Sequence, residues 1–181
     1  GVQTCALPIF ITGNTVIDAL IATAKDDYKF KNQELNRILD ENRDKRLILM
    51  TTHRRENWGE PMTQIYKALK KTLDDFADTY VIFPVHKNPT VRKVVSEILE
   101  NHPRVYLIEP MDYEPFINLM AQTYLILSDS GGIQEEAPSL GIPVLVVRDT
   151  TERPEAVVAG TVNIVGTNYE KVLEDRKSTR L

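Results

Sequence analysis

The chain has 181 residues, of which 42% are hydrophobic and 27% charged, with a formal net charge of -4. This length can bury one sizeable core, and the negative charge argues against nucleic-acid binding. No apolar run approaches the roughly 18–20 residues of a membrane helix, and no signal peptide is visible. The single cysteine, Cys5, excludes a disulfide framework and a thiolate metal site within one chain. We expect a cytoplasmic protein without a metal.

The first 45 residues differ from the rest of the chain. Thr12-Gly13-Asn14-Thr15 precedes an apolar run and is typical of a capped helix start. Lys25 to Asp44 is highly charged, which indicates a solvated helix and turn. We predict a leading segment and charged helical linker over residues 1–45. Residues 1–9 fit no pattern and are treated as a candidate foreign end, and the tail 176–181 is left uninterpreted.

From residue 46 onward, short apolar strands alternate with amphipathic helices. Strands are predicted at Arg46–Thr51, Tyr80–Val85, Val105–Ile108, Tyr124–Ser128, Pro143–Val147 and Thr161–Val165. Helices are predicted at Pro61–Asp78, Pro89–Glu100, Glu114–Gln122, Gly132–Leu140 and Pro154–Ala159. This alternation predicts an α/β fold over residues 46–175, a Rossmann-like parallel sheet with helices on both faces. Right-handed crossovers place the strand-to-helix loops at one edge, where ligands of such sheets bind.

The most informative loop follows the strand that ends at Ser128. Ser130-Gly131-Gly132 lies between a strand and a helix, where unpaired N–H groups and the helix dipole favour an anion. The glycines allow close approach to the backbone. Glu135 and Glu136 follow in the first helical turns and offer acceptors for sugar hydroxyls. The loop therefore predicts a nucleotide or nucleotide-sugar site.

Four other strand ends carry polar or aromatic residues. His53-Arg54-Arg55-Glu56 suits a diphosphate, although a salt-bridged surface turn explains it equally well. His86, alone, is more typical of an ordinary loop histidine. Phe116 suits base stacking, yet a core position is the commoner role of such a ring. Arg153 suits an anion, although Arg148 and Arg153 could simply pair with nearby acids. Together, five such clusters at one sheet edge indicate a ligand site.

Four motifs in this order resemble the non-hydrolysing UDP-N-acetylglucosamine 2-epimerases. They are His53–Asn57, Pro84–Pro89, Asp129–Glu136 and Arg148–Glu155. Ile11–Asp18 is similar to the stretch where that family passes from its first domain to its second. The resemblance implies a GT-B architecture, two Rossmann-like domains with the nucleotide-sugar between them, of which this chain supplies the second.

The implied reaction interconverts UDP-N-acetylglucosamine and UDP-N-acetylmannosamine by elimination and re-addition of UDP, without a cofactor. The carboxylates that move protons at C2 belong to the family's first domain, which is missing here. The chain alone is therefore expected to be inactive. The full-length enzyme is expected to be a cytoplasmic homodimer of cell-envelope polysaccharide biosynthesis.

The resemblance also implies a role for individual residues. Those implied to bind UDP are Ser130, Gly131 and Gly132 at the diphosphate, Glu136 at the ribose, Phe116 in the uracil loop, and Arg153. His53 is the implied catalytic residue beside the diphosphate. Arg54 and His86 are implied to form a regulatory UDP-N-acetylglucosamine site.

Two other functions fit the nucleotide loop. A GT-B glycosyltransferase donor domain shares it, although the strings His53–Asn57 and Arg148–Glu155 argue against that class. A non-catalytic UDP-sugar-binding module is the non-enzyme alternative, and a naturally short chain would favour it.

Overall fold

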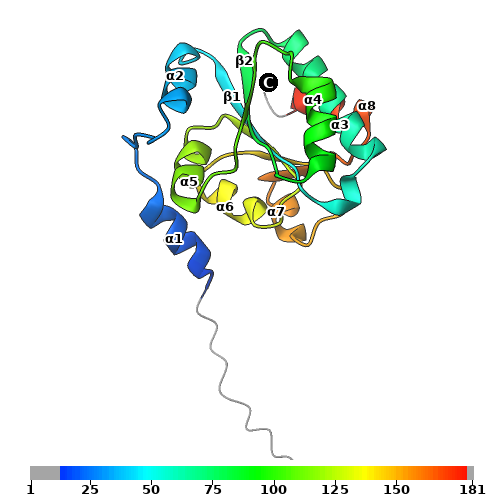
Figure 1. Cartoon of the computed structure of the whole chain (residues 1–181). Helices are drawn as coiled ribbons and strands as arrows, with labels where there is room; N and C mark the ends of the chain where they lie inside the picture. Colours follow the sequence, from blue (N-terminus) through cyan, green and yellow to red (C-terminus); the bar gives the residue numbers. More distant parts are fainter. Residues whose placement is uncertain (1–12, 179–181) are drawn as a thin grey trace, which may run out of the picture.

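The computed structural model describes residues 13–178, with side chains to residue 174, and contains a six-stranded parallel sheet (Figure 1). The strand order is β3-β2-β1-β4-β5-β6, the Rossmann order. The strands are β1 (Arg46–Thr51), β2 (Thr79–Pro84), β3 (Val105–Ile108), β4 (Leu125–Ser128), β5 (Val144–Val146) and β6 (Val162–Ile164). All six coincide with the predicted strands to within one residue at each end, and the predicted fold class is confirmed.

Helices cover both faces of the sheet. They are α1 (Thr15–Thr23), α2 (Gln33–Glu41), α3 (Glu60–Asp75), α4 (Pro89–Leu99), α5 (Tyr113–Ala121), α6 (Ile133–Ser139), α7 (Pro154–Val158) and α8 (Tyr169–Ser178), with a 3-10 turn at Arg55–Asn57. In Figure 1, α3, α4 and α8 lie on one side, and α1, α5, α6 and α7 on the other. Each face has its own core. Along β1, Ile48 and Met50 join one core, whereas Leu47 and Leu49 join the other.

The helices depart from the prediction in two places. Helix α3 ends at Asp75 rather than Asp78, because residues 76–78 turn the chain back into β2. Helix α8 was not predicted, because Val172 and Leu173 are too few to make a clear apolar pattern. Val172 is nevertheless buried and joins the core beside α3. The predicted strands and helices otherwise begin and end within two residues of the observed elements.

The leading segment packs closely against the sheet. Asn14 caps α1 by accepting the N–H of Val16, as predicted. Within the charged stretch, Leu35 and Ile38 of α2 are buried in the core that also holds Leu47. The division into a linker and a separate domain at residue 45 stays a prediction. Cys5 and residues 1–9 lie outside the described residues.

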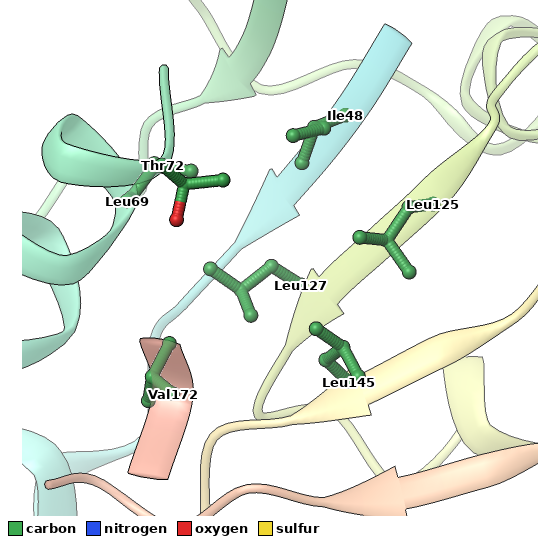
Figure 2. Close-up of a pocket in the computed structure, with 7 residues that line it drawn as sticks. All are labelled: Ile48, Leu69, Thr72, Leu125, Leu127, Leu145 and Val172. Carbon is green, nitrogen blue, oxygen red and sulfur yellow. The ribbon is translucent and has the colours of Figure 1, made fainter. Parts of the chain in front are cut away.

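One small cavity lies inside the core, between the sheet and helices α3 and α8 (Figure 2). Its lining is almost wholly aliphatic: Ile48, Leu69, Thr72, Leu125, Leu127, Leu145 and Val172. The Thr72 hydroxyl donates to the Ala68 carbonyl at 2.8 Å. A volume of about 20 Å³ is room for one water molecule at most. The cavity is therefore a packing imperfection and not a ligand site.

The strand order reverses between β1 and β4, at the centre of the sheet. After β1 the chain continues to β2 on one side, and after β4 it continues to β5 on the other. Thr51 and Ser128 are register partners at the ends of these strands, and their hydroxyls lie 2.8 Å apart. The loops that start at Thr52 and Asp129 therefore leave the sheet side by side. Ligands of open parallel sheets bind at this point. Within residues 13–178, no helix is long and apolar enough to cross a membrane.

Candidate functional site

Asp129 joins the two central loops. Its side chain is fully buried, and both of its oxygens accept hydrogen bonds from the loop after β1. The N–H of His53 lies 3.1 and 3.0 Å from the two oxygens, and the N–H of Arg54 lies 2.9 Å from Oδ2. The Asn57 side-chain amide donates to the same oxygen at 3.1 Å. A buried carboxylate needs such donors to offset its desolvation. Asp129 thereby fixes the path of residues 53–57.

His53 is held by its ring as well as by its backbone. Its Nδ1 lies 3.1 Å from Asp129 Oδ1, while the side chain is 45% exposed. The hydrogen bond to Asp129 raises the pKa of His53, although partial burial and the charge of Arg54 oppose the rise. Burial alone would raise the pKa of Asp129, but the bonds from His53 and Arg54 hold it below its usual value. The His86 ring stacks near His53, with centroids 6.3 Å apart.

Arg54 reaches across to the glycine loop after β4. A Cβ atom placed on Gly131 would lie 3.6 Å from Arg54 Nη2 and 3.6 Å from Glu152 Oε2. Arg54 Nη1 lies 3.9 Å from Glu152 Oε1, and the Arg54 side chain is 35% exposed. The guanidinium of Arg54 therefore lies close to the predicted diphosphate loop. The regulatory role of Arg54 and His86 stays a prediction, and both residues lie next to the predicted catalytic group.

The glycine loop has space above its backbone. Within the described part of the chain, neither Gly131 nor Gly132 donates its N–H to another protein group, while Ser130 N–H donates to Ser128 Oγ. A Cβ on Gly132 would meet nothing nearer than Glu136 Oε2 at 3.9 Å. Neither glycine has a positive φ. The fold therefore has room for a Cβ at both positions, and glycine there leaves the backbone open to close approach.

The loop after β5 uses its first arginine internally. The Arg148 side chain is only 6% exposed. It donates through Nε to Glu56 at 2.6 Å and through both Nη atoms to Glu152 at 2.8 and 3.0 Å. The bond from Arg148 lowers the pKa of Glu152 to about 2. Arg148 thus joins the β5 loop to the β1 loop. It pairs with nearby acids, as the sequence suggested.

Arg153 and Glu135 form a second ion pair. Arg153 Nε bonds Glu135 Oε1, and the Asn14 side-chain amide donates to the other Glu135 oxygen at 2.6 Å. The contact attaches the start of α1 to α6. Arg153 is therefore paired with an acid here, and its nucleotide-binding role stays a prediction.

Glu136 lies in a different environment from its neighbour Glu135. Burial, and then the charge of Glu135, raise the pKa of Glu136, whereas a hydrogen bond with Tyr113 lowers it. Tyr113 begins α5, and Phe116 lies one turn further on, half-buried and packed against the core. Glu136 thus adjoins the start of α5, where the uracil loop is predicted.

A larger cleft lies on the other side of that predicted loop. It has a volume of about 410 Å³. Its lining residues are Tyr28, Phe30, Lys31, Asn32, Ile108, Glu109, Pro110, Met111, Asp112, Glu114 and Pro115. It includes most of the loop but neither Phe116 nor Glu136, so the assignment of Phe116 to the base stays a prediction. No group of three or more potential metal ligands occurs in the described part of the chain.

The structure brings most of the predicted residues together and adds some that the sequence did not single out. Arg54 lies beside Gly131, His53 is bonded to Asp129 next to that loop, and the His86 ring stacks near His53. Asp129, Asn57 and Glu56 had no predicted role of their own. The sequence signal for Asp129 was its position directly after an apolar strand. A carboxylate at such a position can face a ligand or can be buried to hold a loop, so the signal did not decide between the two.

The comparisons with known proteins agree with one another. A family model described as UDP-N-acetylglucosamine 2-epimerase matches residues 6–180. The chain is 49% identical to the UDP-N-acetylglucosamine 2-epimerase of Bacillus subtilis, over 92% of this chain and 42% of the relative. A solved structure of S. aureus MnaA with UDP shares 50% identity with a TM-score of 0.86, over 93% of this chain and 44% of that one. The UDP-GlcNAc 2-epimerase from Neisseria meningitidis, bound to UDP-GlcNAc, shares 44% identity with a TM-score of 0.81, over 93% and 46%.

The chain spans less than half the length of these relatives. The family match covers nearly every residue, and the solved structures share the observed fold. The chain belongs to the UDP-N-acetylglucosamine 2-epimerase family.

Proposed function

We propose that this chain is the UDP-binding half of an enzyme that interconverts UDP-N-acetylglucosamine and UDP-N-acetylmannosamine. The observation that carries the proposal is the pair Gly131 and Gly132. Among the described residues neither N–H has a protein acceptor, a Cβ atom would find room at both positions, and Arg54 lies beside Gly131 with His53 in the same loop as Arg54. The diphosphate of UDP occupies that room and accepts the N–H groups. Family membership and the relatives solved with UDP or UDP-GlcNAc support this assignment.

The other parts of the nucleotide are assigned by position. Glu136 accepts hydrogen bonds from the ribose hydroxyls, and its place between the glycine loop and α5 supports this role. The uracil lies at the loop that leads into α5, near Phe116. Arg153 exchanges its contact with Glu135 for one with the nucleotide. Arg54 and His86 contact a second, regulatory UDP-N-acetylglucosamine beside the first.

The chemistry proposed for this half is departure and return of UDP. Negative charge builds on the diphosphate as the sugar C–O bond breaks, and donors aimed at that charge lower the barrier. His53 is the catalytic residue on this side, because its raised pKa keeps more of the imidazole protonated and its ring is partly exposed. The groups that move the C2 proton come from a first domain, in keeping with the partial coverage of the relatives. The complete enzyme acts as a homodimer in the cytoplasm. Sedimentation velocity would test the oligomeric state.

The central test is titration of UDP into the 181-residue chain, followed calorimetrically. Gly132→Val should abolish binding, because its side chain fills the space above the loop. The substitution should leave the fold intact, because a Cβ meets only ordinary contacts there. Ala121→Val is the control, since it introduces the same β-branched side chain at an exposed residue at the end of α5. Unchanged affinity in Gly132→Val would remove the diphosphate from this loop.

A further inference from the structure

The three histidines of the chain differ in which ring nitrogen accepts a hydrogen bond. His86 Nδ1 accepts the N–H of Asn88 at 3.2 Å. His102 Nδ1 accepts the N–H of Arg104 at 3.2 Å, and its Nε2 faces Asp74 at 3.3 Å. A nitrogen that accepts a hydrogen bond carries no proton. When neutral, His86 and His102 therefore both carry their proton on Nε2.

His53 has the opposite arrangement. Its Nδ1 lies 3.1 Å from Asp129 Oδ1, and an ionised carboxylate can only accept. The lowered pKa of Asp129 keeps that carboxylate ionised. Neutral His53 therefore carries its proton on Nδ1 and leaves the Nε2 lone pair free, beside the exposed ring of His86.

Asp129 is itself immobilised, so it can hold a ring in place. Its N–H donates to the Thr51 carbonyl, and its oxygens accept from His53, Arg54 and Asn57. The donors and the ring belong to one short loop. Asp129 therefore fixes the His53 ring relative to the His53 backbone and to the end of β4.

We propose that Asp129 is a positioning residue that holds His53 as the Nδ1–H tautomer and directs Nε2 to the group bound at Ser130–Gly132. The identity of the group that Nε2 faces rests on the proposed function. The tautomer rests on the contact with Asp129 alone. Asp129 is fully buried, so in this proposal it acts on the ligand through the loop and the ring that it holds. The two neighbouring imidazoles, His53 and His86, then present a free lone pair and an N–H respectively.

The first test needs no ligand, and a variant only to assign the signals. Long-range ¹H–¹⁵N NMR of the 181-residue chain, labelled at histidine nitrogens, is recorded above the pH at which the imidazoles titrate. We expect one Nδ1–H and two Nε2–H patterns, with the former absent from His53→Gln. His86 and His102 serve as internal controls. An Nε2–H pattern for His53 would overturn the proposal.

Asp129→Asn tests the cause of the tautomer. Three N–H donors surround Oδ2, from His53, Arg54 and Asn57, at 2.9–3.1 Å. The asparagine oxygen should take that position and turn its NH₂ towards His53 Nδ1, which must then accept. His53 should change to the Nε2–H pattern. Asn57→Ala removes one donor but leaves the Nδ1 contact, so it should keep the Nδ1–H pattern.

The outcomes separate this proposal from the proposed function. An Nδ1–H pattern that persists in folded Asp129→Asn, judged by unchanged His102 signals, would overturn the role of Asp129. If that variant does not fold, the proposal is tested by the tautomer of His53 in the unchanged chain. Adding UDP should shift the His53 Nε2 resonance. An Nδ1–H His53 that UDP does not shift would contradict UDP binding at this loop and leave the positioning role intact.

Discussion

The loops after β1 and β5 both carry cationic side chains, but they use them differently. In the β5 loop, Arg148 pairs with Glu56 of the β1 loop and with Glu152 of its own loop, and Arg153 pairs with Glu135 of α6. In the β1 loop, His53 is held through one ring nitrogen, and the Arg54 guanidinium has a longer, 3.9 Å contact with Glu152. The β5 arginines thus hold the loops together, whereas the β1 residues keep donor capacity for a ligand. Residue type alone does not distinguish these roles.

The largest expected effect is the absence of proton transfer at C2 when this chain is tested alone. The isolated chain should not exchange deuterium into C2 of UDP-N-acetylglucosamine in heavy water, because C2 proton transfer needs a positioned base. The acids assigned here hold the nucleotide or pair with arginines. Mass spectrometry of the recovered nucleotide-sugar measures the exchange. Exchange above a no-protein background would show that this half carries its own base, and the division between two domains would fail.

The structural role of the β5 loop is tested by Arg148→Met. The change removes three charge-assisted hydrogen bonds, but Glu56 and Glu152 are about half exposed and regain water. We expect a loss of about 1.5–3 kcal/mol in the free energy of unfolding, measured by urea denaturation.

The matched control for that variant is Arg43→Met. Arg43 also pairs with an acid, Asp40, but its side chain is 77% exposed. Removing an exposed pair should cost about 0–1 kcal/mol. Equal destabilisation by both variants would mean that burial does not distinguish the β5 loop from an ordinary surface pair.

The neighbours Glu135 and Glu136 repeat the contrast within one helix. Glu135 is paired with Arg153, whereas Glu136 is assigned to the ribose. Glu136→Ala should weaken UDP binding by about 1.5–3 kcal/mol, about 10- to 160-fold in Kd. Calorimetric titration measures this loss, and EDTA should leave the parent chain unaffected. Normal binding by Glu136→Ala, or loss of binding in EDTA, would contradict the assignment.

The smallest effect is a pH dependence from the β1 loop. The pKa of His53 is raised above 6.5, mainly by its bond to Asp129. The stability that this bond adds is complete below about pH 6.5 and is lost as the pH rises through the raised pKa. The affinity that imidazolium adds for the diphosphate should fall over the same window.

Phosphate ionisation near pH 6 acts in the opposite direction, so the comparison must be between proteins. The ratio of UDP affinities of the parent chain and His53→Gln, measured from about pH 6 to about pH 9, isolates the histidine. We expect this ratio to decline with pH. A constant ratio would show that the charge of His53 does not reach the ligand.

Much of the fold could be predicted because its signals are local. Apolar runs such as Arg46–Thr51 and their alternation with amphipathic helices depend on neighbours a few residues away. Helix α8 was not predicted, because two apolar residues do not establish a helical period. The depth to which α2 is buried was not predicted either, because Leu35 and Ile38 are buried in a core built mostly from residues that come later in the chain.

The sequence by itself determined the order of the elements and the set of polar strand-end loops, because hydrophobic period and turn residues act locally. It left two interpretations open for His53, Arg153 and Phe116. Only the tertiary structure decided that Arg148 pairs with Glu56, 92 residues away, and that Asp129 accepts from donors 72–76 residues away. The physical reason is that the free energy of a buried charge depends on the dipoles and charges around it, and those are assembled only when the chain folds.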